Sequence, residues 1–162
     1  MVSYEILDIK PFTKALFDGN LFDEFLMTEA RIDTYNTFSI DGKTKKGYYT
    51  QGEEESFGIG EYSKWEKIRP VFFLLIKGKR LPLSFHIVLK LSEEEKRKWF
   101  MEKELCDPNI SGLYLNIRYD ERRLCCVSAC SLSGFSMDQG AQRAWDEHIK
   151  EFLRKNQIAV RV

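Results

Sequence analysis

The sequence predicts an α+β fold built mainly on an antiparallel sheet of about six to eight strands. Three observations predict it. Apolar and polar residues alternate in several short segments, three hairpin-like turns carry cations, and the longest helical pattern lies near the end of the chain. We therefore expect three hairpins separated by short helices, with a long C-terminal helix packed on the sheet.

The N-terminal part predicts one strand followed by two short helices. The strand is expected at residues 4–9, and the helices at residues 12–17 and 20–25. Pro11 is tolerated in a first helical turn, and Gly19 is a residue at which a helix commonly stops. These two residues therefore bound the first helix.

The first hairpin is expected to follow these helices. Residues 26–32 alternate between apolar and polar side chains, which is the period of a half-buried strand. Asp41 and Gly42 give a strong hairpin signal, because both residue types accept a positive φ. Tyr48 and Tyr49 are therefore expected on the returning strand.

The middle of the chain predicts a loop, a helix and a second hairpin. Residues 50–60 are rich in glycine and glutamate and predict a surface loop, and residues 61–68 predict a helix. Pro70 is expected to end this helix, because the residue before a proline avoids the helical region. Residues 71–76 are apolar on both faces and predict a central strand. Residues 81–91 are expected to return beside it.

The C-terminal part predicts a helix, a third hairpin and the longest helix. Ser92 and Glu95 have the spacing of a capping box. The hairpin is expected within residues 113–132. Asp138 is expected to cap the last helix, whose apolar stripe should lie on the sheet. A final edge strand is expected at residues 158–162.

Composition predicts a single domain that spans residues 1–162. Twenty-five basic and 25 acidic side chains cancel, so any attraction to nucleic acid has to be local. The start of the chain has no secretion-signal pattern, and no apolar run reaches the roughly 20 residues that cross a bilayer. We therefore expect a cytoplasmic protein with no membrane contact, whose four cysteines are reduced thiols.

No catalytic motif accompanies these elements. The strand-to-helix elbow of serine hydrolases is absent, and Cys125, Cys126 and Cys130 lack the paired spacing of a zinc site. Asp146 and Glu147 are expected on the solvated side of the last helix, which does not favour an acid-base pair. We expect no metal and no cofactor.

An alternative is a small-ligand pocket protein or a small enzyme. His86 and Ser84 are expected on the polar face of one strand, and Cys106 lies in a predicted loop. These three residues are the candidates that such a site would use. The other histidine, His148, is expected to pack within the apolar stripe of the last helix.

The three expected hairpin tips are basic. Cations are ordinary at hairpin turns, because turns are wet and charge protects sheet edges. If the tips face the same way, their summed charge can hold a phosphate backbone. The leading expectation is a non-catalytic binding domain for nucleic acid or another macromolecule. An alternative is a protein-interaction module or homo-oligomer. The candidate binding residues are Lys43, Lys45, Lys46, Lys77, Lys79, Arg80, Arg122 and Arg123.

Several motifs resemble an uncharacterised bacterial family, a domain of unknown function. They are IDTYNTFSIDG at residues 32–42, YSxWxxI at 62–68, LIKGKRLPLSF at 75–85, GLxLNIRY at 112–119 and AWD at 144–146. The resemblance covers most of the chain. It implies no activity, cofactor or site residue.

The order of elements is also similar, more weakly, to one domain of a DNA sliding clamp. That fold would place cations on helices, where this sequence has one comparable cluster at Lys96, Arg97 and Lys98. A helix-grip fold, in which a curved sheet wraps the C-terminal helix, is the other alternative. Likeness at the level of the fold establishes no function.

Overall fold

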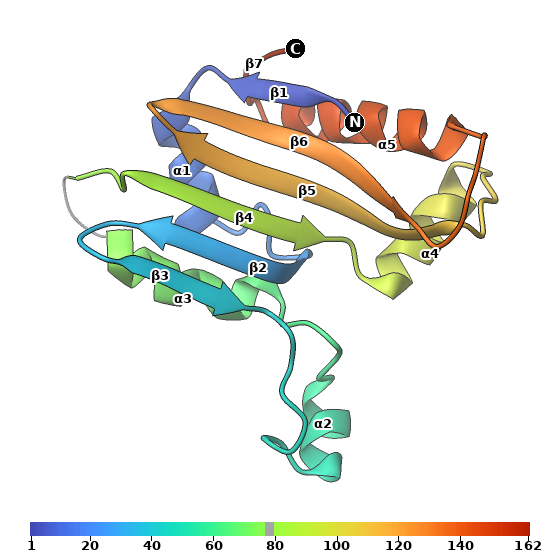
Figure 1. Cartoon of the computed structure of the whole chain (residues 1–162), viewed down its shortest axis with the longest axis horizontal. Coiled ribbons are helices and arrows are strands. Elements are labelled where there is room, and N and C mark those ends of the chain that lie inside the picture. Colours follow the sequence, from blue (N-terminus) through green and yellow to red (C-terminus); the bar gives the residue numbers. More distant parts are fainter. Residues whose placement is uncertain (77–79) are drawn as a thin grey trace.

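A seven-stranded antiparallel sheet organises the chain, and helices cover one of its two faces (Figure 1). The computed structural model describes residues 1–76 and 80–162. The strand order is β3-β2-β4-β5-β6-β1-β7. The strands are β1 (Ser3–Ile6), β2 (Leu26–Asp33), β3 (Thr37–Asp41), β4 (Ser84–Lys90), β5 (Ile110–Asp120), β6 (Arg123–Leu132) and β7 (Val160–Arg161).

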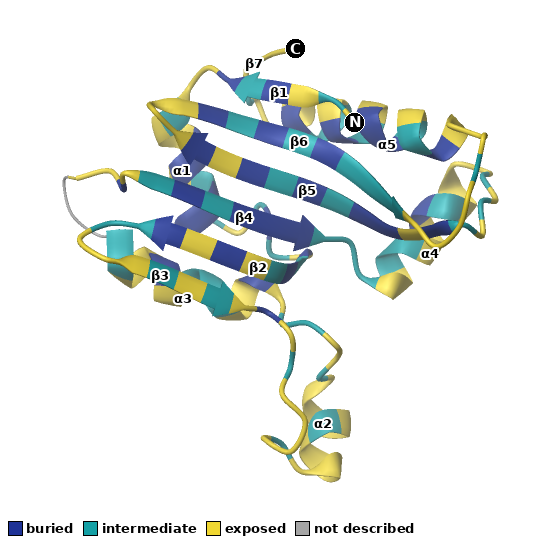
Figure 2. Ribbon diagram, viewed as in Figure 1, coloured by how far each residue is buried: buried dark blue, intermediate teal, exposed yellow. Residues whose placement is uncertain are grey.

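Five helices lie within the described residues: α1 (Ile9–Phe17), α2 (Gln51–Phe57), α3 (Trp65–Ile76), α4 (Glu93–Glu102) and α5 (Gly140–Lys155). The α+β class, the antiparallel sheet and the long C-terminal helix are therefore confirmed. On β5, Leu113, Leu115 and Ile117 are fully buried, while Arg118 is exposed on the opposite face. The same alternation of buried and exposed residues is visible across the sheet in Figure 2.

The third hairpin forms as predicted. Asp120 and Arg123 are paired residues at the ends of β5 and β6, which leaves a turn of two residues, Glu121 and Arg122. Both have positive φ, 48° and 65°, the combination that a type I′ hairpin turn requires. Neither residue is a glycine or an asparagine, the residue types typical of this turn. The sequence therefore predicts where the chain turns, but not the type of the turn.

The first hairpin turns seven residues earlier than predicted. Its turn is at residues 34–36, where the Thr34 amide donates to the Asn36 carbonyl at 3.0 Å. The expected turn at Asp41 and Gly42 is therefore wrong. A Cβ at Gly42 would lie 1.8 Å from the carbonyl oxygen of Met27, so this glycine permits a close approach to β2.

The second hairpin does not exist, because the predicted strand at residues 71–76 is the second half of α3. Pro70 lies inside this helix instead of ending it. The helix is fastened on both sides of the proline: the Trp65 indole donates to the Leu16 carbonyl at 3.0 Å, and Phe72 is fully buried. These tertiary contacts compensate for the roughly 3 kcal/mol that a proline costs inside a helix.

The predicted loop at residues 50–60 contains a helix, α2. Both hydrogen bonds of a capping box are present at the start of this helix. Thr50 accepts from the Glu53 amide, and the Glu53 side chain accepts from the Thr50 amide. Tyr48 and Tyr49 lie beside this helix rather than on a strand. The helix expected at residues 20–25 is a series of turns.

Helix α5 packs on β6 through its expected stripe. The buried side chains of this stripe are Ala141, Trp145, Ile149 and Leu153. Asp138 precedes the N-cap residue Gln139 and accepts from the Gly140 amide at 2.8 Å. Ser92 caps α4 as predicted and accepts from the Glu95 amide at 3.2 Å.

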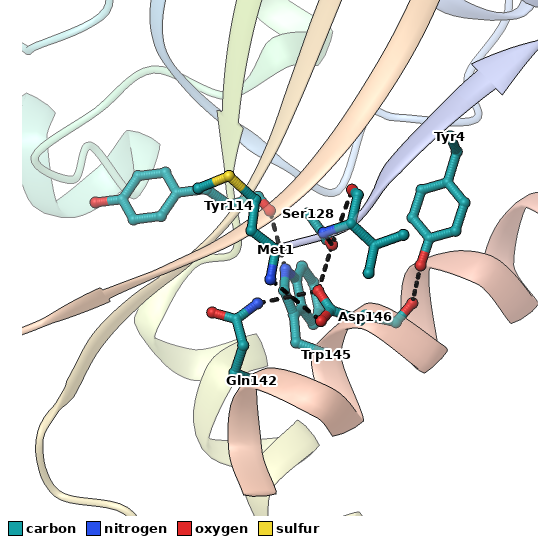
Figure 3. A network of polar contacts seen from close by, with 8 residues as sticks. Met1, Tyr4, Tyr114, Ser128, Gln142, Trp145 and Asp146 are labelled. Atoms are coloured by element: carbon teal, nitrogen blue, oxygen red, sulfur yellow. Dashed lines mark hydrogen bonds and ion pairs between the residues drawn. The ribbon is translucent and has the colours of Figure 1, made fainter. Parts of the chain in front are cut away.

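Asp146 is buried, so the prediction of a solvated carboxylate at this position is wrong. Figure 3 shows its surroundings at the contact of α5 with β6 and β1. The carboxylate accepts from the Ser128 hydroxyl, from the Gln142 amide at 3.0 Å and from the Met1 amino group at 3.3 Å. The Tyr4 hydroxyl donates to the Asp146 carbonyl at 2.6 Å. Burial, and then the charge of Asp146, raises the pKa of Tyr4 to about 12.

Candidate functional site

Helix α3 leaves large apolar side chains on the surface of the protein. Its Leu74 is 66% exposed, and Val71 and Phe73 are exposed beside it. The segment that leads into β4 and the turn between β2 and β3 add further apolar side chains to the same region. We define the α3 surface as these six residues: Tyr35, Val71, Phe73, Leu74, Leu81 and Leu83.

Two hollows connect all of these side chains except Val71. The first, of about 210 Å³, lies between α1 and α3 and is lined by Phe17, Phe73, Ile76 and Leu81 among others. The second, of about 440 Å³, lies between α3 and the β2–β3 turn. Ile76 and Leu81 line both hollows. Exposed apolar surface that is contiguous and hollowed is a mark of interaction sites.

Cationic side chains border the α3 surface. Lys10 and Lys14 of α1 line the first hollow, and Arg80 lines the second. Asp18 is the carboxylate among the lining residues of the two hollows. The lining therefore carries three cations and one anion, and its potential favours a partner with negative charge beside apolar side chains.

Helix α3 is held on the protein by its first half. Arg69 makes a bidentate pair with Asp23, with both nitrogen to oxygen distances at 3.0 Å, and both side chains are largely buried. The Trp65 amide donates to the Phe25 carbonyl at 2.9 Å. These contacts fix the helix without using its exposed apolar side chains, which therefore stay free for a partner.

The structure separates the predicted basic residues. The segment with Lys43, Lys45 and Lys46 follows β3 and leads to α2, whereas the β5–β6 turn lies at the other end of the strands (Figure 1). Lys45 pairs with Asp41 at 3.4 Å, and Arg123 pairs with Glu5 at 3.3 Å.

The remaining candidate binding residues in the described part of the chain also lie in different parts of the fold. Arg122 occupies the β5–β6 turn, and Arg80 lines a hollow of the α3 surface. Lys77 and Lys79 lie outside the described residues. The described candidates thus do not form one rim, and their binding role stays a prediction.

A row of polar side chains crosses the uncovered face of the sheet. In neighbouring strands Arg31 pairs with His86, His86 with Arg118, and Arg118 with Cys125. Partial burial, and then the positive charge of Arg118, lowers the pKa of His86. The surroundings therefore favour the neutral form of this histidine.

The hydroxyl of Ser84 does not pair with His86. It donates instead to the Asp33 carboxylate at 2.6 Å, and this bond, together with one from Thr37, lowers the pKa of Asp33. His86 lines a separate depression of about 350 Å³ with Arg31, Glu29 and others. The residues proposed for the enzyme alternative are therefore not arranged as a nucleophile and its base.

The four thiols differ in their access to solvent. Cys106 is exposed, in keeping with its expected place in a loop. Complete burial raises the pKa of Cys126, and partial burial raises the pKa of Cys130 to about 11. The thiolate is the reactive form, so these two cysteines are poor nucleophiles.

Two further findings bear on the kinds of site the protein offers. Within residues 1–76 and 80–162, no three His, Cys, Asp or Glu side chains come together in a way that could bind a metal ion. Over the same residues, every helix is too short or too polar to span a bilayer.

The fold and its surfaces define an α+β protein with an antiparallel sheet covered on one face and an uncovered apolar helix. The chain belongs to a family of unknown function, DUF5721, whose family model matches residues 15–161. This match confirms the resemblance that the motifs carry. No curated protein and no solved structure matches the chain. The sliding-clamp and helix-grip alternatives stay predictions.

Sequence reasoning missed the α3 surface. Residues 71–76 are six consecutive apolar residues, a pattern shared by buried strands and apolar helices. Trp65, Arg69, Phe72 and Ile76 recur every three to four residues, and this helical spacing was the available signal. This spacing was overlooked because Pro70 was expected to end the helix.

Proposed function

We propose that this chain is a non-catalytic protein-binding module whose α3 surface receives an apolar, acidic segment of a partner protein. The observation that supports this most is the exposure of Leu74, Leu83 and Tyr35 around two hollows bordered by Lys10, Lys14 and Arg80. Burying one such apolar side chain contributes about 1.5–3 kcal/mol to binding. The three cations select a partner whose apolar residues are flanked by carboxylates.

We also infer that the protein works in the cytoplasm of a bacterium. Its four cysteines are free thiols, as is usual in a reducing compartment, and the motif resemblance supports the bacterial source.

Site-specific photocross-linking in cells tests the docking surface. A photoreactive residue at Leu74 should give one discrete adduct, and the same residue at Glu147, on the exposed side of α5, should give none. The joined peptide should contain apolar residues next to Asp or Glu. Changing Lys10, Lys14 and Arg80 together to Glu should abolish the adduct.

Three outcomes would overturn the proposal: no adduct at Leu74, equal adducts at both positions, or an adduct that survives the charge reversal. An adduct of twice the mass of the chain would identify a second copy as the occupant, in place of the acidic partner. Light scattering at two protein concentrations checks that outcome independently.

Nucleic-acid binding is the second candidate, supported by the row of Arg31, His86 and Arg118 on the uncovered sheet face. Changing Arg31 and Arg118 together to Ala should weaken binding to a labelled single-stranded oligonucleotide. It should also flatten the salt dependence between about 50 and 200 mM. An unchanged slope would reject this row on the uncovered sheet face as the binding site.

A further inference from the structure

A short paired stalk carries residues 45–60 away from the sheet as a lobe (Figure 1). Lys43 and Tyr62 form an antiparallel bridge, the Thr44 amide donates to the Glu61 carbonyl at 2.8 Å, and the Ser63 amide to the Gly42 carbonyl at 2.9 Å. Gly42 also donates to the Thr28 carbonyl at 2.8 Å. The stalk is thus fixed to β2, and it sets the position of the lobe.

The lobe has almost nothing of its own to bury. Helix α2 contains no buried residue, and Phe57 at its end is 61% exposed. The helix is closed by its capping box and by Gly58, which has the left-handed φ of 63° at the C-cap. An isolated helix of seven residues is too short to be stable in water. The stability of α2 therefore depends on contacts on the side of the helix that faces the start of α3.

A hollow of about 260 Å³ lies on that side, between the lobe and the start of α3. Tyr49, Phe57 and Ile59 line it from the lobe, and Tyr62 lines it from the stalk. The rings of Tyr49 and Phe57 meet edge to face at 6.0 Å. A cavity of about 150 Å³ accepts benzene, so this hollow has room for a two-ring compound.

Two lysines give the hollow its charge. Lys64 and Lys67 line it with one carboxylate, Glu66. The Lys67 ammonium donates to the Tyr49 hydroxyl at 2.5 Å and lies 5.0 Å from the centre of the Tyr49 ring. An ammonium has three donors, so this contact leaves Lys67 two for a ligand.

We propose that this hollow is a binding site for a small aromatic carboxylate. Its ring packs among Tyr49, Phe57 and Tyr62, and its carboxylate accepts from Lys64 and Lys67. The glutamates of α2 are absent from the lining but close to it in the chain, so they favour a singly charged carboxylate over a phosphate dianion. The site lies apart from the α3 surface and shares no residue with it.

Titration with indole-3-acetate, followed by amide NMR shifts, tests the site. Saturable shifts should be confined to residues 44–67, and the neutral analogue indole-3-acetamide should bind about tenfold more weakly, as expected for one lost charge-assisted hydrogen bond. Lys67→Met should lower the affinity for indole-3-acetate by a similar factor. Lys150→Met, an exposed lysine on α5, is the matched control and should leave it unchanged.

The proposal is overturned if no shift saturates, if the shifts fall on the α3 surface or the uncovered sheet face, or if the acetate and the acetamide bind equally. Phe57→Ala provides a second variant, because this side chain is 61% exposed and lies outside the buried core. It should weaken both compounds equally, since it removes ring packing and no charge. Retained affinity in that variant also counts against the site.

Discussion

Helices α3 and α5 cover the same face of the sheet, yet the more apolar of the two is the less buried. Helix α5 is largely polar, and it buries a complete stripe together with the carboxylate of Asp146. Helix α3 is largely apolar, and it buries Trp65 and Phe72 but leaves Val71, Phe73 and Leu74 exposed. The second half of α3, residues 71–76, is apolar on all sides, and such a segment is normally covered on all sides. The contrast supports the proposal that the exposed side of α3 meets a partner, whereas α5 packs within the described part of the chain.

The largest expected effect is on the buried side of α3. Phe72→Ala should lower the free energy of unfolding by about 3–5 kcal/mol, because it opens a cavity in the core. Urea denaturation measures this loss. Phe73→Ala removes the same ring one position along and should cost clearly less, because Phe73 is partly exposed. Equal losses would contradict the described orientation of the helix.

A somewhat smaller effect is expected beneath α5. Asp146→Ala should cost about 2–3 kcal/mol, because it leaves the Ser128 hydroxyl and the Gln142 amide without their acceptor. The neighbouring exposed residue provides the control: Glu147→Ala should stay within about 0.5 kcal/mol of the parent. A stable Asp146→Ala protein would show that the polar cluster in Figure 3 contributes little to folding.

The pH dependence comes from histidines that the fold keeps neutral. Burial, and then the positive charges of Lys103 and Lys155, lowers the pKa of His148, whose ring stacks on Trp145 at 5.2 Å. The unfolded chain binds a proton at about pH 6.5, and the folded chain binds it only at lower pH. Stability should therefore be fully present above that pH and should fall as the pH drops through it. Urea midpoints between about pH 8 and pH 5 measure the fall.

A variant identifies the contribution of this histidine. His148→Phe keeps a ring on Trp145 and removes the titrating group, so part of the fall should disappear. His86, whose pKa is also lowered, should account for a further part. An unchanged pH profile in the His148→Phe protein would exclude His148 as a source.

The smallest effect on stability is expected at the exposed side of α3. Leu74→Ser should change the free energy of unfolding by no more than about 0.5 kcal/mol, yet it should eliminate the partner adduct formed by a photoreactive residue at Leu83 on the same surface. Leu153→Ser, at a buried position of α5, should instead destabilise the protein by several times that amount. A strongly destabilised Leu74→Ser protein would mean that Leu74 is covered within the chain.

The sequence predicted the parts of the fold that short-range patterns determine. The third hairpin, the cap at Ser92 and the stripe of α5 follow from alternation, capping spacing and helical period. It failed where distant contacts decide. Gly42 signals a turn by its type, but its conformation is set by the approach to Met27 on the neighbouring strand. As a charged residue, Asp146 is expected on the solvent-exposed face of its helix. In the fold it is buried, where Ser128 and Met1 donate hydrogen bonds to its carboxylate.

The candidate site was predicted less well than the fold. The sequence identified basic candidate residues, but it could not show which of them lie together. Tyr35 and Leu83 become neighbours because β2 pairs with β4 as far as Asp33 and Ser84. A short local window cannot distinguish an apolar run that the chain covers from one left open for another molecule.

The stalk beneath the lobe has a consequence for engineering and for evolution. Lys43 and Tyr62 already face one another as paired residues, at the spacing that a two-residue turn can close. We therefore expect that the intervening segment can be excised, lengthened or exchanged without moving a strand of the sheet. The lobe is therefore a position where insertions can change binding specificity while the sheet and its helices stay the same.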